Sequence, residues 1–396
     1  MNNTPTNYTP RQGKLPLLLL WLLTALFACH KSNVNDKDLR DFKQVNLVAN
    51  KAIYHPITAI DTTLQNAFGI AWAPSGIAWV NSVGGHVSEI YNSEGVALRA
   101  PVRIPSPTDT IGGLPCGIVF NTSKGFVLPN GSSSTFLFTG FDGVLSAWNG
   151  PSGNNAKRIK AVPKSGYTGL AIATNDGQTF IYGANFLASR IDVWDSNFGL
   201  VKWMSFKDPG LPQNYSPYNI QAVGNWLFVM YAQLYNGDHV EGKGKGFVSV
   251  FNTDGSFVKR FASHGTLDIP WGVTMAPGSF LEDKDMDGDD GGSVYGKTTS
   301  SYNGGGNNGG NNNHGRRDPK DPVILVGNFG DGHINVFTQE GNFLGQLQSH
   351  RQVITIDGLW ALSFPPATST IDQSRLYFSA GPAKETDGIF GYLIKQ

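Results

Sequence analysis

The sequence predicts an all-β fold: a single six-bladed β-propeller of four-stranded blades, closed by an N-terminal strand. The first observation behind this prediction is a repeated unit of a glycine or asparagine, an apolar strand, a tight turn and a second strand. The second is the alternation of apolar residues within the strands, such as Ile334 and Val336, which gives each strand a buried face. The third is the period of about 50 residues, which suits one blade of four strands. The repeats begin at Gly69, Gly117, Gly169, Asn219 and Gly272, and a sixth begins at Gly358.

The first repeat shows how each unit fills a blade. "GIAWAPS" supplies the inner strand, "IAWVNS" the second, "HVSEIYN" the third and "VALRAPVRI" the outer one. Ser75-Gly76 and Glu94-Gly95 lie between these strands and favour tight hairpins. Unrelated strands of a β-sandwich are the alternative, but they do not explain five comparable repeats.

The sixth blade is one strand short, because the chain ends at Gln396. The unassigned segment "FKQVNLVAN", residues 42–50, has the pattern of a strand. We therefore predict that it pairs with the last blade and closes the ring, since an open ring leaves a hydrophobic edge exposed. Its alternation predicts a buried face formed by Val45, Leu47 and Ala49.

Residues 1–28 have the features of a lipoprotein signal peptide. Two basic residues precede an apolar run of about a dozen residues, which is short against the ~20 needed to span a bilayer. The run ends in "LFAC", where Ala28 precedes the cleavage site and Cys29 would carry the lipid. Acylation of Cys29 leaves Cys116 without a disulfide partner. A plain cleaved signal peptide and an N-terminal anchor helix are the alternatives.

The rest of the chain divides into a tether and the propeller. Residues 29–41 are polar and unpatterned and predict a flexible tether, and the propeller spans residues 42–396. Within it, a Gly/Asn/Asp-rich insert at about residues 281–321 has almost no apolar residues, so we expect it to be disordered. We expect an exported cell-envelope lipoprotein, either periplasmic or exposed on the outer membrane.

The composition limits the partners. The 396 residues are 40% hydrophobic, enough for a large core, and 30 basic residues balance 30 acidic ones. A net charge of zero provides no field to attract nucleic acid, which we exclude as a partner. The expected partners are the membrane, through the lipid anchor, and an unknown protein, peptide or glycan ligand.

The insert contains two motifs. "GGSVYGKT", residues 291–298, fits the spacing of a phosphate loop, but no strand precedes it and no helix follows, so we interpret it as chance and expect no nucleotide. "DKDMDGDD" begins like a calcium loop, with Asp283, Asp285 and Asp287 as ligands, but the twelfth position, which should supply a glutamate, is Val294. We predict no cofactor, with calcium at these three aspartates as the alternative.

Four stretches resemble the signatures of an uncharacterised family of exported bacterial proteins with NHL-like propeller repeats. The resemblance covers roughly residues 45–393. It implies a six-bladed propeller and brings no established activity and no assigned catalytic residues. The insert is a departure, because relatives connect those strands briefly. The stretches are "PWGVTMAP" (270–277), "VGNFGDGHINVF" (326–337), "IDGLWALSF" (356–364) and "YFSAGP" (377–382).

A ligand site is predicted at one mouth of the central channel, where the loops that enter the inner strands meet the loops between second and third strands. Amides and aromatic faces there suit a neutral polar ligand such as a sugar or peptide. The alternative is that asparagines after strands satisfy local backbone groups. The candidates are Asn81, Asn130, Asn185 and Asn328 after second strands, Tyr231 in the fourth blade, and Tyr218, Asn219, Trp271, Asp357 and Trp360 where the inner strands begin.

These residues favour a binding or interaction module, and a metal-dependent hydrolase of the lactonase or gluconolactonase-like propeller type is the alternative. That site needs several carboxylates around a hard cation, and the predicted mouth has no glutamate. We assign no catalytic residue. His86 and His333 are interpreted as surface residues, and Cys116 as a buried space-filling thiol. The available metal ligands are Asn130, Asn185, Asn219 and Asp357.

Overall fold

The computed structural model describes residue 1 and residues 39–281 and 321–396. The signal peptide, the lipidation site Cys29, most of the tether and the insert with both of its motifs therefore lie outside the described residues. Leu39, at the end of the segment predicted as a tether, is 3% exposed and belongs to the core. The ordered propeller thus begins a few residues before residue 42.

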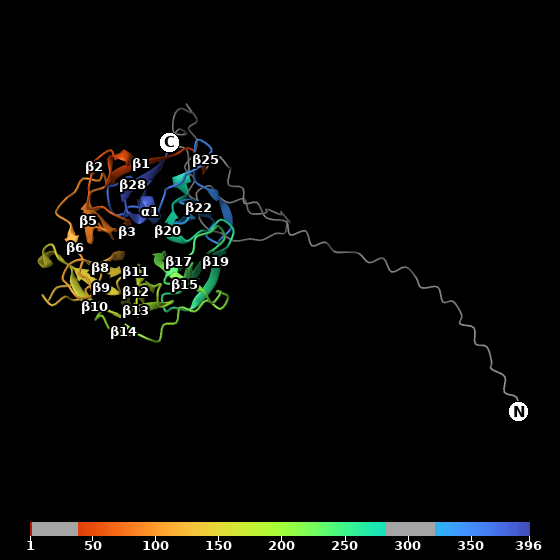
Figure 1. Ribbon diagram of the computed structural model, residues 1–396, viewed down its shortest axis with the longest axis horizontal. Helices are drawn as coiled ribbons and strands as arrows, with labels where there is room; N and C mark the ends of the chain where they lie inside the picture. The colour runs from red at the N-terminus through yellow and green to blue at the C-terminus, as the bar shows by residue number, and fades with distance from the viewer. Residues whose placement is uncertain (2–38, 282–320) are drawn as a thin grey trace, which may run out of the picture. The chain divides into compact units, whose positions relative to one another are not determined.

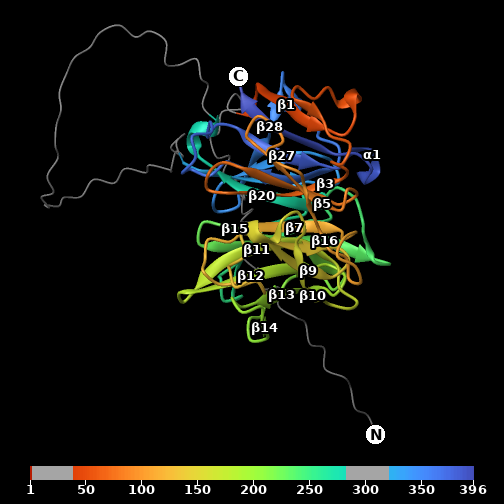
Figure 2. The same cartoon turned by 90° about the vertical axis from the view of Figure 1, so that its left-hand side faces the viewer.

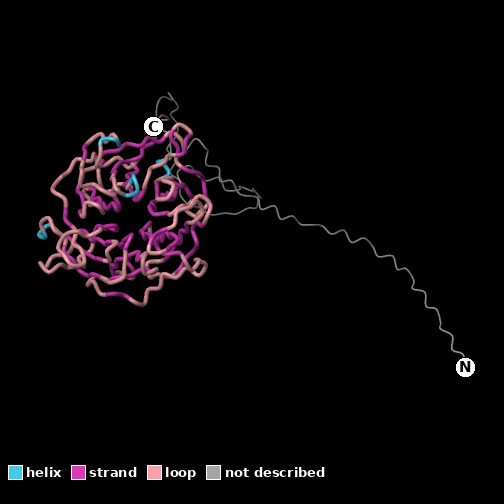
Figure 3. The backbone as a smooth tube through the Cα atoms, viewed as in Figure 1, coloured by secondary structure: helices cyan, strands magenta, loops and turns pink. Residues whose placement is uncertain are grey.

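Six sheets surround a central axis, which confirms the predicted all-β six-bladed propeller (Figures 1 and 3). In every blade the neighbouring strands are antiparallel, and the four strands follow one another from the axis to the rim. Blade one consists of β3 (Ala67–Trp72), β4 (Ala78–Ser82), β5 (Val87–Tyr91) and β6 (Val102–Arg103). Blade two consists of β7 (Pro115–Phe120), β8 (Phe136–Gly140), β9 (Val144–Trp148) and β10 (Lys157–Ala161). Blade three consists of β11 (Tyr167–Asn175), β12 (Gln178–Asn185), β13 (Arg190–Trp194) and β14 (Leu200–Val201).

The remaining blades have the same order, with additions at their edges. Blade four consists of β15 (Tyr215–Val223), β16 (Trp226–Tyr235), β18 (Gly246–Phe251) and β19 (Phe257–Ser263). Blade five consists of β20 (Pro270–Ala276), β21 (Val323–Asn328), β22 (Ile334–Phe337) and β23 (Phe343–Gln346). Blade six consists of β26 (Leu359–Ser363), β27 (Leu376–Ala380), β28 (Ile389–Lys395) and β1 (Phe42–Ala49). The additions are β2 (Ala59–Ile60), β17 (Asp238–His239), β24 (Gln348–Ser349), β25 (Gln352–Val353) and the short helices η2 (Ala52–Tyr54), η3 (Gly150–Ser152), η4 (Gly278–Leu281) and α1 (Pro382–Glu385).

The N-terminal strand closes the ring, as predicted. β1 pairs antiparallel with β28 from Phe42 to Ala49, so the first strand lies beside the last one in Figure 1. Leu47 and Ala49 are buried as expected, but Val45 is only half-buried and Val48 on the other face is fully buried. The expectation of one buried face was therefore wrong for the second half of β1. There β2 pairs with its outer edge, and the register shifts after Asn46.

The glycines that begin the repeats allow the inner strands to approach one another at the axis. A Cβ on Gly169 would lie 2.0 Å from Oδ1 of Asn219 in the next blade, and a Cβ on Gly272 would lie 2.7 Å from the carbonyl oxygen of Trp360. Real Cβ atoms do not come this close to other heavy atoms. The repeated glycine is thus a consequence of ring closure rather than of turn formation.

The second blade differs from the prediction. Its second strand is β8, whereas the apolar stretch "GFVLPN" forms a long connection in front of it. Phe126 in this connection is fully buried and packs on Phe198 of blade three, with 5.3 Å between ring centroids. The connection was mistaken for a strand because its apolar residues have the same spacing.

Candidate functional site

Six side chains, one from each inner strand, meet at the axis near one end of the channel. Near the start of each inner strand the register with the second strand shifts, for example between Pro115 and Gly117 and between Tyr167 and Gly169. Such a bulge leaves one residue out of the ladder and redirects its side chain. The shifts in blades one and six contain two residues each, and the first residue within each of the six shifts is Phe68, Cys116, Thr168, Tyr218, Trp271 or Trp360.

These side chains block the channel. Trp360 stacks on Phe68 with 3.8 Å between ring centroids, and on Phe329 with 4.0 Å. Trp271 in blade five donates its Nε1 hydrogen to the carbonyl oxygen of Thr168 in blade three, at 3.0 Å. Because this bond crosses the axis, Trp271 separates the two ends of the channel.

A cavity of about 430 Å³ lies on the mouth side of this barrier. We call it the mouth cavity. Five of the six bulge residues line it and form its floor: Phe68, Cys116, Thr168, Tyr218 and Trp360. A second cavity of about 220 Å³ follows the inner strands on the other side, and Trp271 lines that one.

The rim of the mouth cavity is polar, and two additions to the blades supply most of it. β16 continues beyond its blade, turns at Asn236-Gly237 and returns as β17, which carries Asp238 and His239. Both turn residues have positive φ, 52° and 85°, as a two-residue hairpin requires. α1 carries Glu385, and Figure 2 shows α1 and the end of β16 on the same side of the ring.

Two series of side-chain contacts connect the rim of the cavity with its floor. Trp360 Nε1 donates to Asn66 Oδ1 at 2.8 Å, and Asn66 Nδ2 donates to Glu385 Oε2 at 2.9 Å. On the opposite side the Tyr218 hydroxyl lies 3.0 Å from His239 Nδ1, which is 3.1 Å from Asp238 Oδ1. The rim therefore consists of Asn66, Asp238, His239 and Glu385.

Burial in this cavity changes the acidity of its groups. Loss of hydration raises the pKa of Glu385, and the nearby Asp238 and Glu241 raise it further, against the hydrogen bond from Asn66 and the charge of His239. Burial also raises the pKa of the Cys116 thiol, and Cys116 has no disulfide partner. The thiol is therefore protonated at neutral pH, which confirms that Cys116 is a buried space-filling residue.

Of the ten predicted site residues, the structure places Tyr218 and Trp360 in the mouth cavity and Trp271 in the barrier beneath it. The asparagines have other partners. Asn81 Nδ2 donates across to the carbonyl oxygen of Cys116 in the next blade, at 3.2 Å, and Asn219 Nδ2 donates to that of Trp271, at 2.8 Å. Both are buried; Asn81 joins β4 of blade one to the inner strand β7, and Asn219 joins the inner strands β15 and β20.

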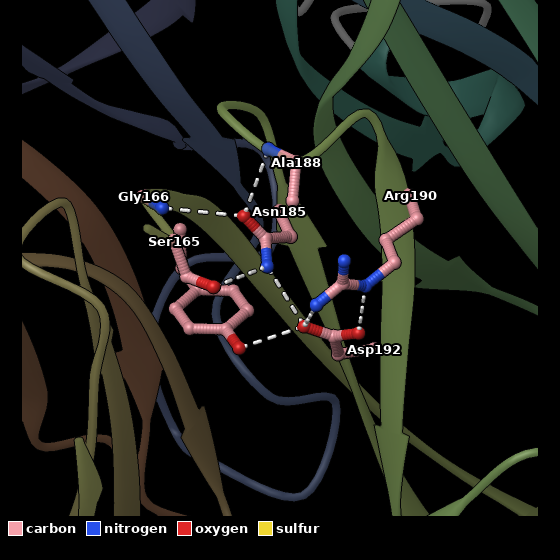
Figure 4. A network of polar contacts seen from close by, with 7 residues as sticks. Ser165, Gly166, Asn185, Ala188, Arg190 and Asp192 are labelled. Carbon is pink, nitrogen blue, oxygen red and sulfur yellow. Dashed lines mark hydrogen bonds and ion pairs between the residues drawn. The ribbon is translucent and has the colours of Figure 1, made fainter. Parts of the chain in front are cut away.

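Asn185 and Asn328 hold loops together. Asn185 is fully buried, accepts hydrogen bonds from the backbone N–H groups of Gly166 and Ala188, and donates to Ser165 and Asp192 (Figure 4). Asn328 Nδ2 similarly donates to the Thr266 carbonyl oxygen and to Asp331 Oδ1, at 2.7 and 2.9 Å. The alternative interpretation, satisfaction of local groups, holds for both.

Three further candidates do not line the mouth cavity. Tyr231 is 3% exposed and packs in the core between blades three and four. Asn130 lies exposed on the connection of blade two, where it bonds Asn149. Asp357 is exposed and accepts the Ala383 N–H at 3.0 Å.

The residues proposed for a mouth-bound ion therefore do not fit one, because Asn130, Asn185, Asn219 and Asp357 bond to different parts of the ring. In the part of the chain that the structure describes, no three His, Cys, Asp or Glu residues are arranged to hold a metal. His86 is exposed and contacts the Gly113 carbonyl oxygen, as expected for a surface residue. His333 is partly exposed and lies 3.1 Å from Asp331.

Sequence reasoning missed Asn66, His239 and Glu385. The turn "YNGDH" contains Asn236-Gly237, a strong hairpin signal, and could have revealed the β16–β17 extension. Glu385 had no such signal, because α1 reaches its position through three successive residues with positive φ, from Ala383 to Glu385.

No family model matches the chain. It is 34% identical over 240 residues to an uncharacterized protein of Acanthamoeba polyphaga mimivirus, covering 58% of this chain and 51% of that protein. Two more uncharacterized proteins of this virus match at 29% over 299 residues (71% of this chain, 63% of that protein) and 31% over 270 residues (63% and 43%). The chain spans about half the length of the curated relatives it matches. The resemblance to bacterial proteins with NHL-like repeats stays a prediction.

Solved structures similar to the chain include a streptogramin B lyase, with 10% identity, a TM-score of 0.46 and coverage of 89% of this chain and 96% of that one. A virginiamycin B lyase from Staphylococcus aureus has 11% identity, a TM-score of 0.41 and coverage of 90% and 99%. These similarities are too weak to carry information on function. Within the described residues, no helix is long and apolar enough to cross a membrane.

Proposed function

We propose that this propeller is a binding module that takes a small molecule with an apolar body into the mouth cavity. The observation that carries the proposal is the cavity itself, a space of about 430 Å³ with an aromatic floor and a polar rim. Binding pockets for small molecules have this size and this mixture of apolar walls with a few polar groups. A sugar or peptide held by these asparagines loses its support, because they do not line the mouth cavity and their side chains bond to other parts of the propeller.

The test uses three probes with one phenyl body and different head groups: 2-phenylethanol, 2-phenylethylamine and 3-phenylpropanoate. Val83 lies on the rim of the cavity and is partly exposed, so Val83→Trp should fill the cavity without disturbing the floor. We expect ligand-observed NMR to detect binding of at least one probe to the full-length chain and no binding to Val83→Trp.

The matched control is Val353→Trp, which adds the same side chain at an exposed position on β25. It should bind like the unmodified chain. Undiminished binding by Val83→Trp would exclude the mouth cavity as the site, and failure of all three probes would contradict the proposed function.

We also propose that the propeller is exported and held at a membrane by a lipid on Cys29. The support is the sequence "LFAC" at the end of an apolar run of signal-peptide length. Cys29→Ser should move the protein from the membrane fraction to the soluble fraction and abolish labelling by a fatty-acid analogue. Cys116→Ser is the control and should stay at the membrane, and a membrane-bound Cys29→Ser protein would refute the anchor.

A further inference from the structure

We propose that the ligand of the mouth cavity is a compact organic cation, with its ammonium group against Glu385 and its apolar body on the aromatic floor. This inference rests on the proposed function, because it names the chemical class that the same cavity would take. Its support is the charge of the rim, the aromatic floor and one polar atom of the floor, Thr168 Oγ1, that has no partner among the described residues.

The rim is acidic and lacks a strong cation. The carboxylates of Asp238 and Glu241 lie close enough to Glu385 to act on it electrostatically, and Asp238 lines the cavity with it. In residues 39–281 and 321–396, neither Lys nor Arg forms an ion pair with Glu385, and its Oε1 accepts no hydrogen bond. A partly buried carboxylate that no Lys or Arg neutralises is destabilised, so a ligand that brings a positive charge is favoured.

The floor suits the same kind of ligand. Phe68, Tyr218 and Trp360 present aromatic groups, and Phe186 adds a fourth in the wall. Aromatic rings attract cations within about 6 Å of their centres, and they also bury an apolar body. A cation with a short apolar group therefore gains from both parts of the cavity.

One polar atom of the floor has no hydrogen-bond partner among the described residues. Thr168 lines the cavity, is 3% exposed, and its Oγ1 forms no hydrogen bond with the described residues. A buried hydroxyl without a partner is costly, so unpaired groups of this kind mark places where a ligand or water completes the structure. Oγ1 can accept an N–H or O–H from a ligand.

The other classes fit less well. An anion would be repelled by Glu385 and Asp238. A bare divalent ion needs several hard oxygen ligands, and Glu385 is the single rim carboxylate that Asn66 holds in place. A neutral ligand would leave the Glu385 carboxylate with His239 as its only nearby cationic group among the described residues.

The test compares 2-phenylethylamine with 2-phenylethanol, which share the phenyl body and differ in the charge of the head group. We expect isothermal titration to show that the unmodified full-length chain binds the amine at least about tenfold more tightly than the alcohol. Glu385→Gln keeps the size of the side chain and an oxygen for Asn66 but removes the charge. The variant should bind the amine about tenfold more weakly than the unmodified chain does, and its affinity for the alcohol should change by less than about twofold.

Asp176→Asn is the control, because it removes an exposed carboxylate from the β11–β12 turn at the far end of the blade. It should leave both affinities unchanged. The cation proposal would be overturned, while the binding function stands, if Glu385→Gln lost the same affinity for the amine as for the alcohol. The same holds if the unmodified chain bound the two probes with equal affinity. No binding of either probe would instead count against the binding function itself.

Discussion

Removal of residues 1–50 is expected to make the propeller insoluble or to lower its melting temperature strongly, whereas removal of residues 1–38 should leave the folded domain unchanged. The longer truncation deletes β1, which pairs with β28 along its whole length. Its loss would leave a row of unpaired backbone groups on β28, and such an edge promotes aggregation. It also removes Phe42, which is fully buried and packs on Phe280 with 5.0 Å between ring centroids. Solubility and thermal unfolding followed by circular dichroism measure the difference.

A point variant in the full chain gives the same answer when the truncated protein cannot be purified. Phe42→Ala should lower the free energy of unfolding by about 3 kcal/mol, because it empties a buried site between the closing strand and blade five. Lys43→Ala on the same strand is exposed and should have little effect. Equal stability of the two truncated proteins, or of the two variants, would mean that β1 does not close the ring.

The strand that closes the ring could be predicted because the evidence for it is local. Each repeat contains its own alternation and its own turn, so a missing strand at one end of the chain and a spare strand at the other are visible in the sequence. The repeated glycines were equally visible, although their cause is tertiary, as the 2.0 Å approach at Gly169 shows. The prediction of the second strand of blade two was wrong because "GFVLPN" has the apolar pattern of a strand. Only its packing against Phe198 identifies this stretch as a connection.

The candidate site could be predicted only in part. Tyr218 and Trp360 were found because both are aromatic residues where an inner strand begins, and the side chains there reach the axis. The asparagines were misplaced because a side-chain amide satisfies a buried backbone group as readily as a ligand, and the sequence does not distinguish the two. Glu385 could not be found, since its position depends on a left-handed turn that no residue in "PAKET" signals.

A second large effect is expected at Glu89 in the third strand of blade one, where Glu89→Gln should stabilise the propeller at alkaline pH and not at acidic pH. Glu89 is 3% exposed and lies near Asp61, and no cation of the described residues acts on it. Burial and the charge of Asp61 raise the pKa of Glu89 to about 7 from its ordinary value of 4.5. Thr63 Oγ1 lies 2.5 Å from Glu89 Oε1 and 2.6 Å from Asp61 Oδ1. One hydroxyl hydrogen serves only one carboxylate, so the second contact is satisfied when Glu89 is protonated and donates to Thr63.

The direction of the pH effect follows from this raised pKa. The folded chain keeps the proton at a pH where the unfolded chain has lost it, so the contribution to stability is complete below about pH 4.5 and is lost as the pH rises to about 7. The shift corresponds to a free energy of unfolding on the order of 3 kcal/mol. Glutamine carries no charge and can donate to Thr63, so the variant should avoid this loss.

Chemical denaturation across this pH range measures the effect. The unmodified chain should lose stability relative to Glu89→Gln between about pH 4.5 and 7, and the two should agree at the acidic end. Other buried carboxyl groups with a raised pKa, such as Asp142 and Asp268, remain in both proteins and cancel in the comparison. Glu241→Gln removes an exposed carboxylate and should follow the unmodified chain at every pH. Parallel curves for Glu89→Gln and the unmodified chain would show that Glu89 is already ionised in the folded protein, and that Thr63 donates to one carboxylate while the other is stabilised by solvent.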